Sequence, residues 1–155
     1  MHMNEQSERR FGVRVTHQER YRFLSQASEA GQKHGAPYLS DEPEPVGDNA
    51  GPSTPALLAS AIGHCLSASL LECLKHAHVD VLSCRADAVA VVRPNAEGNP
   101  RIDHVEVTIR PQVKGPSKRL TRCEDVYKNY CTVTSSVERG IAVEVKIDWD
   151  VVDHT

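Results

Sequence analysis

The sequence predicts an α+β fold in which a mostly antiparallel sheet packs with one long, buried central helix. Alternating apolar residues near the N-terminus indicate short strands, and an apolar run over residues 54–78 indicates the helix. Two later runs rich in β-branched residues flank a turn, as in a long hairpin. A chain of 155 residues suits one domain, which we expect to cover residues 11–155 after a polar tail of residues 1–10.

The N-terminal part is expected to be a small meander. Apolar residues alternate on both sides of a polar turn, first Val13 and Val15 and then Tyr21 and Phe23. A third extended piece follows at residues 36–39. The next stretch, up to the helix, is rich in Pro, Gly, Asp and Asn and therefore predicts a loop.

Thr54 and Pro55 mark the start of the central helix, because Thr can cap free N–H groups and Pro favours the first helical position. The helix should run to about His78, and it is apolar on nearly every side, which is typical of a helix buried all round. A membrane span is the alternative, since about 20 apolar residues cross a bilayer. His64 and Glu72 interrupt the run, so a protein interior or subunit interface is favoured.

The second half of the chain is expected to contain a hairpin, two helical stretches and a last strand. The hairpin covers residues 79–92 and 102–113, and helices follow over residues 117–129 and 132–138. Gly140 should end the second helix. Apolar residues then alternate with mostly polar ones up to residue 151, which predicts a half-buried strand.

Charge and composition exclude several classes of protein. Eighteen Lys and Arg residues against twenty-one Asp and Glu residues give a formal charge of -3, so nucleic acid is not an expected partner. The first ten residues lack the apolar core of a signal peptide, and we expect a cytoplasmic protein. Five cysteines form no CxxC pair, which argues against a disulfide framework and a paired-thiolate zinc site.

Two of the cysteines stand where chemistry is plausible. Cys65 lies about three turns into the central helix, where burial would raise its pKa and a nearby cation would be needed to activate it. Cys131 lies between two helical stretches, where free N–H groups favour a thiolate. From the residues alone, a structural role is the default for each. Cys73 and Cys84, among apolar neighbours, are interpreted as small buried residues.

The segment GPSTPALLASAIGHCLSASLLECL resembles the first signature of the OsmC/Ohr family, the osmotically inducible protein C-like and organic hydroperoxide resistance proteins. In that signature a reactive cysteine follows ten residues after the Pro that starts the helix. The later CTVTSSVERGIAVEV is similar to the family's second signature. The resemblance covers roughly residues 11–151 and implies an intertwined homodimer whose long helices lie back to back at its centre.

The resemblance implies a thiol peroxidase for organic hydroperoxides, acting in oxidative-stress defence without metal or flavin. Cys65 would attack the O–O bond and become a sulfenic acid, and Cys131 would resolve it to a disulfide. A dithiol such as dihydrolipoamide, or a lipoylated protein, would reduce that disulfide. The family's activating cation is an Arg of the N-terminal strands. Arg22 is the best match, with Arg20 and Arg14 as substitutes, and a solvated strand Arg is the alternative.

Two departures from the family pattern keep a second function open. Many of these peroxidases have Glu after the helix-starting Pro, where it orients the Arg, but this chain has Ala56. The second cysteine is often followed by Pro, and here Thr132 follows it. The alternative is a non-catalytic OsmC-like dimer that binds a small apolar molecule. A cysteine hydrolase is a more distant alternative, because the sequence around Cys65 lacks the final Gly of a nucleophile elbow.

Overall fold

The computed structural model describes residues 8–114 and 117–152, so most of the expected polar tail lies outside the described residues. The chain separates into two compact units. The first, here called the N-terminal unit, comprises Met1–Ala61 and Asp87–Thr108. The second, the C-terminal unit, comprises Ile62–Ala86 and Ile109–Thr155. The division crosses the long helix and both hairpin strands.

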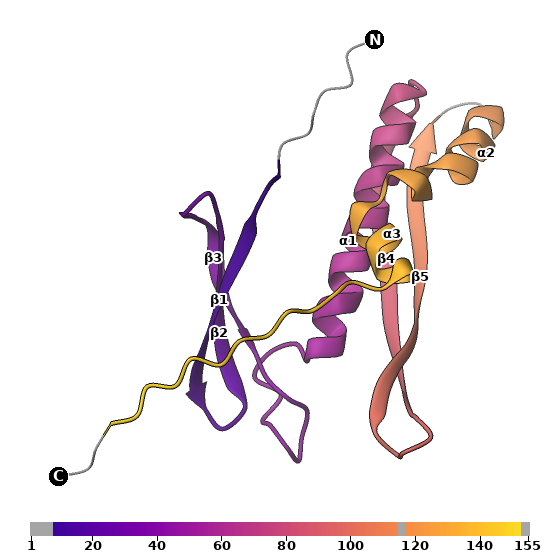
Figure 1. The fold of residues 1–155 in the computed structure, drawn as a ribbon. Coiled ribbons are helices and arrows are strands. Elements are labelled where there is room, and N and C mark those ends of the chain that lie inside the picture. The colour runs from indigo at the N-terminus through magenta and orange to yellow at the C-terminus, as the bar shows by residue number, and fades with distance from the viewer. Residues whose placement is uncertain (1–7, 115–116, 153–155) are drawn as a thin grey trace. The chain divides into compact units, whose positions relative to one another are not determined.

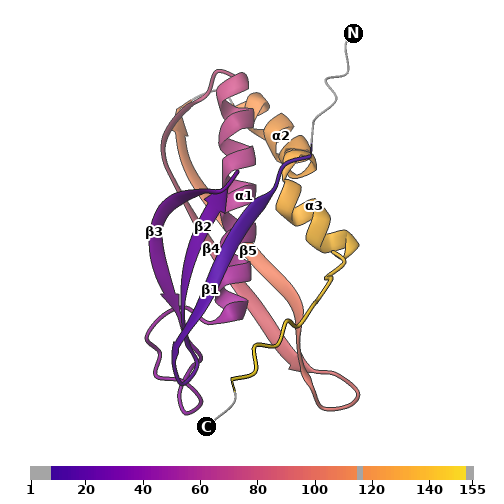
Figure 2. The ribbon, with the colours of Figure 1, turned by 60° about the vertical axis from the view of Figure 1, so that its left-hand side comes forward.

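The N-terminal unit contains the expected meander of three antiparallel strands (Figure 2). These are β1 (Phe11–Glu19), β2 (Arg22–Glu29) and β3 (Gln32–Ser40), with β2 in the middle. Tight turns join consecutive strands, and the second places Gly31 at a φ of 79°, a conformation that glycine adopts without strain. The predicted strand class and order are confirmed here.

Asp41 organises the loop that follows β3. Its buried carboxylate accepts hydrogen bonds from the backbone N–H groups of Glu42, Asp48 and Ala50, at 2.8, 3.0 and 3.1 Å. Gly47 packs so closely beneath it that a Cβ there would lie 2.1 Å from the carbonyl oxygen of Glu42. The loop is therefore a fixed structure that contains no helix or strand.

The helix α1 (Thr54–His76) begins at the predicted residue and ends two residues early. It is long and apolar enough to cross a bilayer by length and composition, a property that core helices of soluble proteins share. The expectation of burial on all sides is wrong for the single chain. The buried side chains lie at spacings of three or four residues, on one face: Ala59, Ile62, Leu66, Leu70 and Leu74.

The hairpin consists of β4 (Asp80–Pro94) and β5 (Pro100–Lys114), both longer than predicted. Asn95 closes its turn, because its side-chain oxygen accepts from the N–H groups of Glu97 and Asn99 at 3.1 and 2.9 Å. Gly98 has a φ of 81° in the same turn. Local side-chain bonds of this kind are what make Asn a turn residue.

The C-terminal unit packs around the end of α1. Its buried cluster consists of Leu70, Leu74, Val79 and Cys123. Three short helical elements follow the hairpin: α2 (Ser117–Val126), the 3-10 helix η1 (Tyr127–Tyr130) and α3 (Thr132–Arg139). Gly140 ends α3 as predicted, with a φ of 79°. Figure 1 shows this chain of short helices, in orange, beside α1.

The half-buried last strand that the sequence predicts is not formed in the single chain. The residues from 141 to 152 have no regular structure and are exposed, and Figure 1 shows them as an extended trace. Val143 and Trp149 have exposed fractions of 82% and 80%. A strand needs a neighbouring strand to satisfy its backbone N–H and C=O groups, and none of the described residues provides one.

Candidate functional site

Cys131 occupies the N-terminus of α3. Its backbone is extended (φ -82°, ψ 101°), and its sulfur accepts from the N–H of Thr134 at 3.4 Å, as an N-cap side chain does. The Thr134 hydroxyl lies 3.0 Å from the same sulfur. The thiol is fully buried. The predicted position between two helical stretches is confirmed.

Cys65 projects from α1 in the same unit and is only half-buried. Its sulfur lies near enough to that of Cys131 for the two thiols to shift each other's pKa, and the backbone N–H groups of Val133 and Thr134 act to lower the pKa of both. Both cysteines are free thiols. The structure therefore brings together two of the three predicted site residues, which lie 66 positions apart in the chain.

The two thiols shift each other's acidity in opposite directions. Burial and the hydrogen bond with Cys131 raise the pKa of Cys65. The backbone N–H groups of Val133 and Thr134 act to lower it, but their effect is smaller. Burial opposes ionisation of Cys131 as well, but hydrogen bonds from Cys65 and from Thr134 outweigh it and lower the pKa of Cys131. Of the two thiols, Cys131 is therefore the one whose thiolate the local hydrogen bonds favour.

The two thiols also differ in their exposure to solvent. Cys131 has no exposed surface, so a dissolved substrate has no access to its sulfur in this arrangement. The half-buried Cys65 is the sulfur that a substrate can approach. A reaction at this pair would therefore begin at Cys65, once the negative charge has moved to it from Cys131.

Arg22, the third predicted site residue, begins β2 in the N-terminal unit. Carboxylates hold its guanidinium: Glu19 at 2.6 Å, Asp48 at 3.3 Å and the buried Asp41 at 4.0 Å. Its Nε–H is buried and has no hydrogen-bond acceptor among the described residues. A role beside Cys65 stays a prediction.

The two substitute arginines differ in their contacts. Arg20 forms an ion pair with Asp48 and donates to the carbonyl oxygen of Val46 at 3.2 Å. Arg14 lies exposed in the middle of β1. His64, next to Cys65 on α1, is exposed. Arg20 therefore shares the carboxylate of Asp48 with Arg22.

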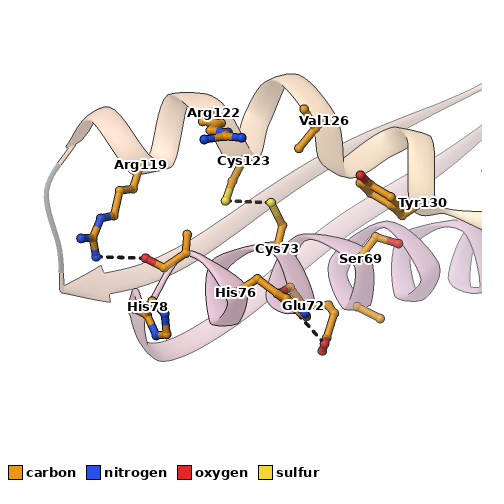
Figure 3. Close-up of a pocket in the computed structure, with 12 residues that line it drawn as sticks. Ser69, Glu72, Cys73, His76, His78, Arg119, Arg122, Cys123, Val126 and Tyr130 are labelled. Carbon is orange, nitrogen blue, oxygen red and sulfur yellow. Dashed lines mark hydrogen bonds and ion pairs between the residues drawn. The ribbon is translucent and has the colours of Figure 1, made fainter. Parts of the chain in front are cut away.

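A second thiol pair was missed by the sequence interpretation, which treated Cys73 as an inert buried residue. Its sulfur lies 2.8 Å from that of Cys123 on α2 (Figure 3). A signal for this pair exists in the sequence. Cys73 lies eight residues after Cys65, and Cys123 lies eight residues before Cys131, so two antiparallel segments that bring one pair together can also bring the other together.

A cavity of about 930 Å³ adjoins this second pair and not the first. It lies between the C-terminal half of α1 and α2. No group of three or more His, Cys, Asp or Glu side chains suited to a metal ion occurs in the part of the chain that the structure describes.

Comparison with known proteins identifies the family that this arrangement resembles. A family model described as OsmC-like protein matches residues 47–146. A solved OsmC-like protein of unknown function from Vibrio cholerae is similar, with a TM-score of 0.65 and 17% identity, over 86% of this chain and 95% of that chain. A search of curated protein sequences finds no match to this chain.

Two other similar structures carry names that refer to peroxides. An OsmC-like hydroperoxide resistance protein from Jannaschia sp. has a TM-score of 0.52 and 12% identity, over 90% of this chain and 92% of that one. An organic hydroperoxide resistance protein from Bacillus subtilis has a TM-score of 0.51 and 13% identity, over 86% and 91%. At such identities the likeness shows a shared fold.

Proposed function

The chain belongs to the OsmC-like protein family, and from that premise we propose that it is a thiol-dependent peroxidase that reduces organic hydroperoxides in oxidative-stress defence. The observation that carries the proposal is that Cys65 lies close enough to Cys131, at the N-terminus of α3, for each thiol to shift the pKa of the other. Similar structures named as hydroperoxide resistance proteins support the substrate class.

The proposed reaction begins at Cys65, the more accessible thiol. Its thiolate attacks one peroxide oxygen, the O–O bond breaks, and the alkoxide leaves and takes up a proton as the alcohol. Cys65 is then a sulfenic acid. The Cys131 thiolate attacks its sulfur, the S–O bond breaks as the disulfide forms, and the leaving hydroxide takes up a proton to become water. A dithiol, of the dihydrolipoamide type or on a lipoylated protein, reduces the disulfide by two successive exchanges.

Arg22 is proposed as the cation that stabilises the Cys65 thiolate. Its guanidinium donates to Glu19 and Asp48, at 2.6 and 3.3 Å, and the buried carboxylate of Asp41 lies 4.0 Å from its Nε. The resemblance gives the role of orienting the Arg to a Glu at the position of Ala56. The proposal assigns this orienting role to the loop carboxylate of Asp48, which accepts from Arg22.

The working form is proposed to be a cytoplasmic homodimer. Apolar side chains alternate along the exposed C-terminal segment, which suits addition of a strand to a second copy. On α1, the exposed positions Ala61, His64, Ala68 and Leu71 lie on a face that the single chain leaves open. A second copy that covers this face would bury apolar positions of α1 that the single chain leaves exposed.

The proposal is tested by peroxide consumption in purified wild-type protein and in Cys65→Ser, with Cys84→Ser as the matched control. Cys84 is another half-buried free thiol, but it lies on β4. We expect consumption of cumene hydroperoxide to be lost in Cys65→Ser and unchanged in Cys84→Ser. Peptide mass mapping of the oxidised wild type should find a disulfide between Cys65 and Cys131.

Further variants locate the cation. Arg22→Gln should slow the reaction of Cys65 with peroxide at neutral pH, and raising the pH should restore much of the rate, because the thiolate then forms without the cation. Arg14→Gln serves as its control. Equal peroxide consumption by wild type and Cys65→Ser would sink the peroxidase proposal and favour the ligand-binding dimer.

A further inference from the structure

Cys73 and Cys123 form a contact that the proposed peroxidase reaction does not use. Their sulfurs are 2.8 Å apart, and a disulfide requires about 2.05 Å, so a small movement of side chains would join them. Cys73 projects from α1 and Cys123 from α2, and Figure 3 shows the two sulfurs pointing toward each other across the space between these helices. The pair is therefore positioned for covalent closure.

A small molecule can reach this pair through the cavity. Both cysteines line the cavity of about 930 Å³, and Cys73 is half-buried whereas Cys123 is buried. Cys73 is thus the sulfur that an incoming reagent meets first. The volume lies within the range of about 300–1,000 Å³ that is typical of small-molecule sites.

The charge of the cavity wall favours an anionic reagent. Arg119 and Arg122 of α2 both line it, against the single carboxylate of Glu72. Glu72 already interacts with His76, at 3.3 Å. Arg122 has no ion pair among the described residues, and its charge lies close enough to Cys123 to oppose the rise in that thiol's pKa.

We propose that Cys73 and Cys123 are a second redox-active dithiol, which a small carboxylate-bearing disulfide entering this cavity oxidises to an intramolecular disulfide. The Cys73 thiolate attacks one sulfur of the reagent, whose S–S bond breaks, and the first thiol leaves. The Cys123 thiolate then attacks Cys73 Sγ in the mixed disulfide, and the second thiol leaves. Two electrons and two protons thereby pass from the protein to the reagent, which is released as two thiols.

The order of the two steps follows from the surroundings of each sulfur. Burial, followed by the neighbouring Cys73 thiol, raises the pKa of Cys123 to about 11. Cys123 is therefore a poor first nucleophile at neutral pH. Closure of the mixed disulfide should accelerate as the pH rises toward that value.

The second pair acts independently of the first. Cys65 and Cys73 are eight residues apart on α1, which corresponds to about 12 Å along the helix axis. Direct exchange between sulfurs at that separation is impossible without a large movement. The second pair therefore needs its own oxidant, and its chemistry does not depend on peroxide reduction at Cys65.

The test uses Cys65→Ser/Cys84→Ser/Cys131→Ser, in which Cys73 and Cys123 are the only cysteines. Oxidised glutathione, a disulfide with four carboxylates, is the probe. We expect release of two glutathione molecules per chain and a cross-linked peptide pair from α1 and α2. A protein that retains only Cys84 is the control, and it should stop at the mixed disulfide.

The role of charge is tested with Arg122→Gln in the same background. Oxidation by glutathione disulfide should slow by about two- to fivefold, the effect expected of a partly exposed charge pair. Oxidation by the neutral bis(2-hydroxyethyl) disulfide should not change. If the triple variant does not fold, mapping of oxidised wild type against Cys73→Ser gives the same answer.

Three results would overturn the proposal. The first is the absence of a Cys73 to Cys123 cross-link in a folded protein, and the second is a reaction that stops at a mixed disulfide on Cys73. The third is modification of Cys84 in the control protein as fast as modification of Cys73 in the test protein. Because the test protein lacks Cys65 and Cys131, none of these results bears on the peroxidase proposal.

Discussion

At the scale of single residues, Asp41 shows how one side chain fixes a loop that has no regular structure. Its carboxylate has an exposed fraction of only 1% and is surrounded by backbone N–H donors, and Arg22 lies at its edge. These donors, above all that of Ala50, lower the pKa of Asp41 below its ordinary value of 3.8, although burial opposes them. The charged form is thus favoured by folding.

This shift predicts how stability depends on pH. Because the folded pKa is lowered, Asp41 contributes stability that is fully present above about pH 3.8 and is lost as the pH falls through the folded pKa. Asp41→Asn should lower the free energy of unfolding at neutral pH and flatten its fall on acidification. Urea unfolding between neutral and acidic pH measures both effects. Glu44→Gln, an exposed carboxylate in the same loop, should leave the profile unchanged.

Several residue-level features were beyond sequence interpretation because they depend on contacts between distant segments. Arg22 could be proposed as the cation, but its carboxylate partners at 41 and 48 stand in a loop whose shape no local pattern gives. The local sequence at Ala56 likewise shows only that a Glu is absent there, whereas the carboxylates around Arg22 come from other segments of the chain.

At the scale of elements, α3 matters through its first turn. Its N–H groups, together with the Thr134 hydroxyl, stabilise the negative charge of the Cys131 sulfur. Helix N-termini stabilise anions in this way because their first N–H groups have no partner within the helix. The short helix therefore determines which state of the thiol pair is populated.

Thr134→Val tests this role, since valine keeps the shape of threonine and lacks the hydroxyl. The first ionisation of the Cys65 and Cys131 pair should shift to higher pH, and closure of the disulfide by the Cys131 thiolate at neutral pH should slow. Ultraviolet absorbance of the thiolate against pH measures the shift. Thr132→Val changes an exposed threonine of the same turn and should have little effect. Equal shifts in the two variants would contradict a specific role for the Thr134 hydroxyl.

Element boundaries were largely predictable where a local signal marks them. Thr54 and Pro55 gave the start of α1, and Gly140 gave the end of α3, because capping preferences are properties of a few adjacent residues. The last strand was not formed, although its alternation is regular from Ile141 to Val151. Alternation of apolar and polar residues shows that a segment could form a strand with one apolar face. The strand forms only where a second strand is available for backbone hydrogen bonding.

At the scale of the whole molecule, the exposed apolar segment after α3 predicts self-association. Replacing Val143 and Val145 by Asp should convert a dimer to monomers. Both side chains are largely exposed in the single chain, so the new charges should destabilise an interface without destabilising the folded monomer. Sedimentation velocity over a range of protein concentrations measures the oligomeric state of the wild type and of the variant. Glu144→Gln, on the opposite face of the segment, should leave the dimer intact. A wild type that is monomeric throughout would contradict the prediction.

In the sequence, the hairpin of β4 and β5 lies between Cys73 and Cys123, which are 50 positions apart. A disulfide at that pair would make the hairpin part of a closed covalent ring, which in the chain-entropy model restricts the unfolded state by about 4 kcal/mol. A protease cut at the exposed turn around Gly98 would then open the ring without separating its halves. The oxidised protein would run as one band on a non-reducing gel and as two after reduction.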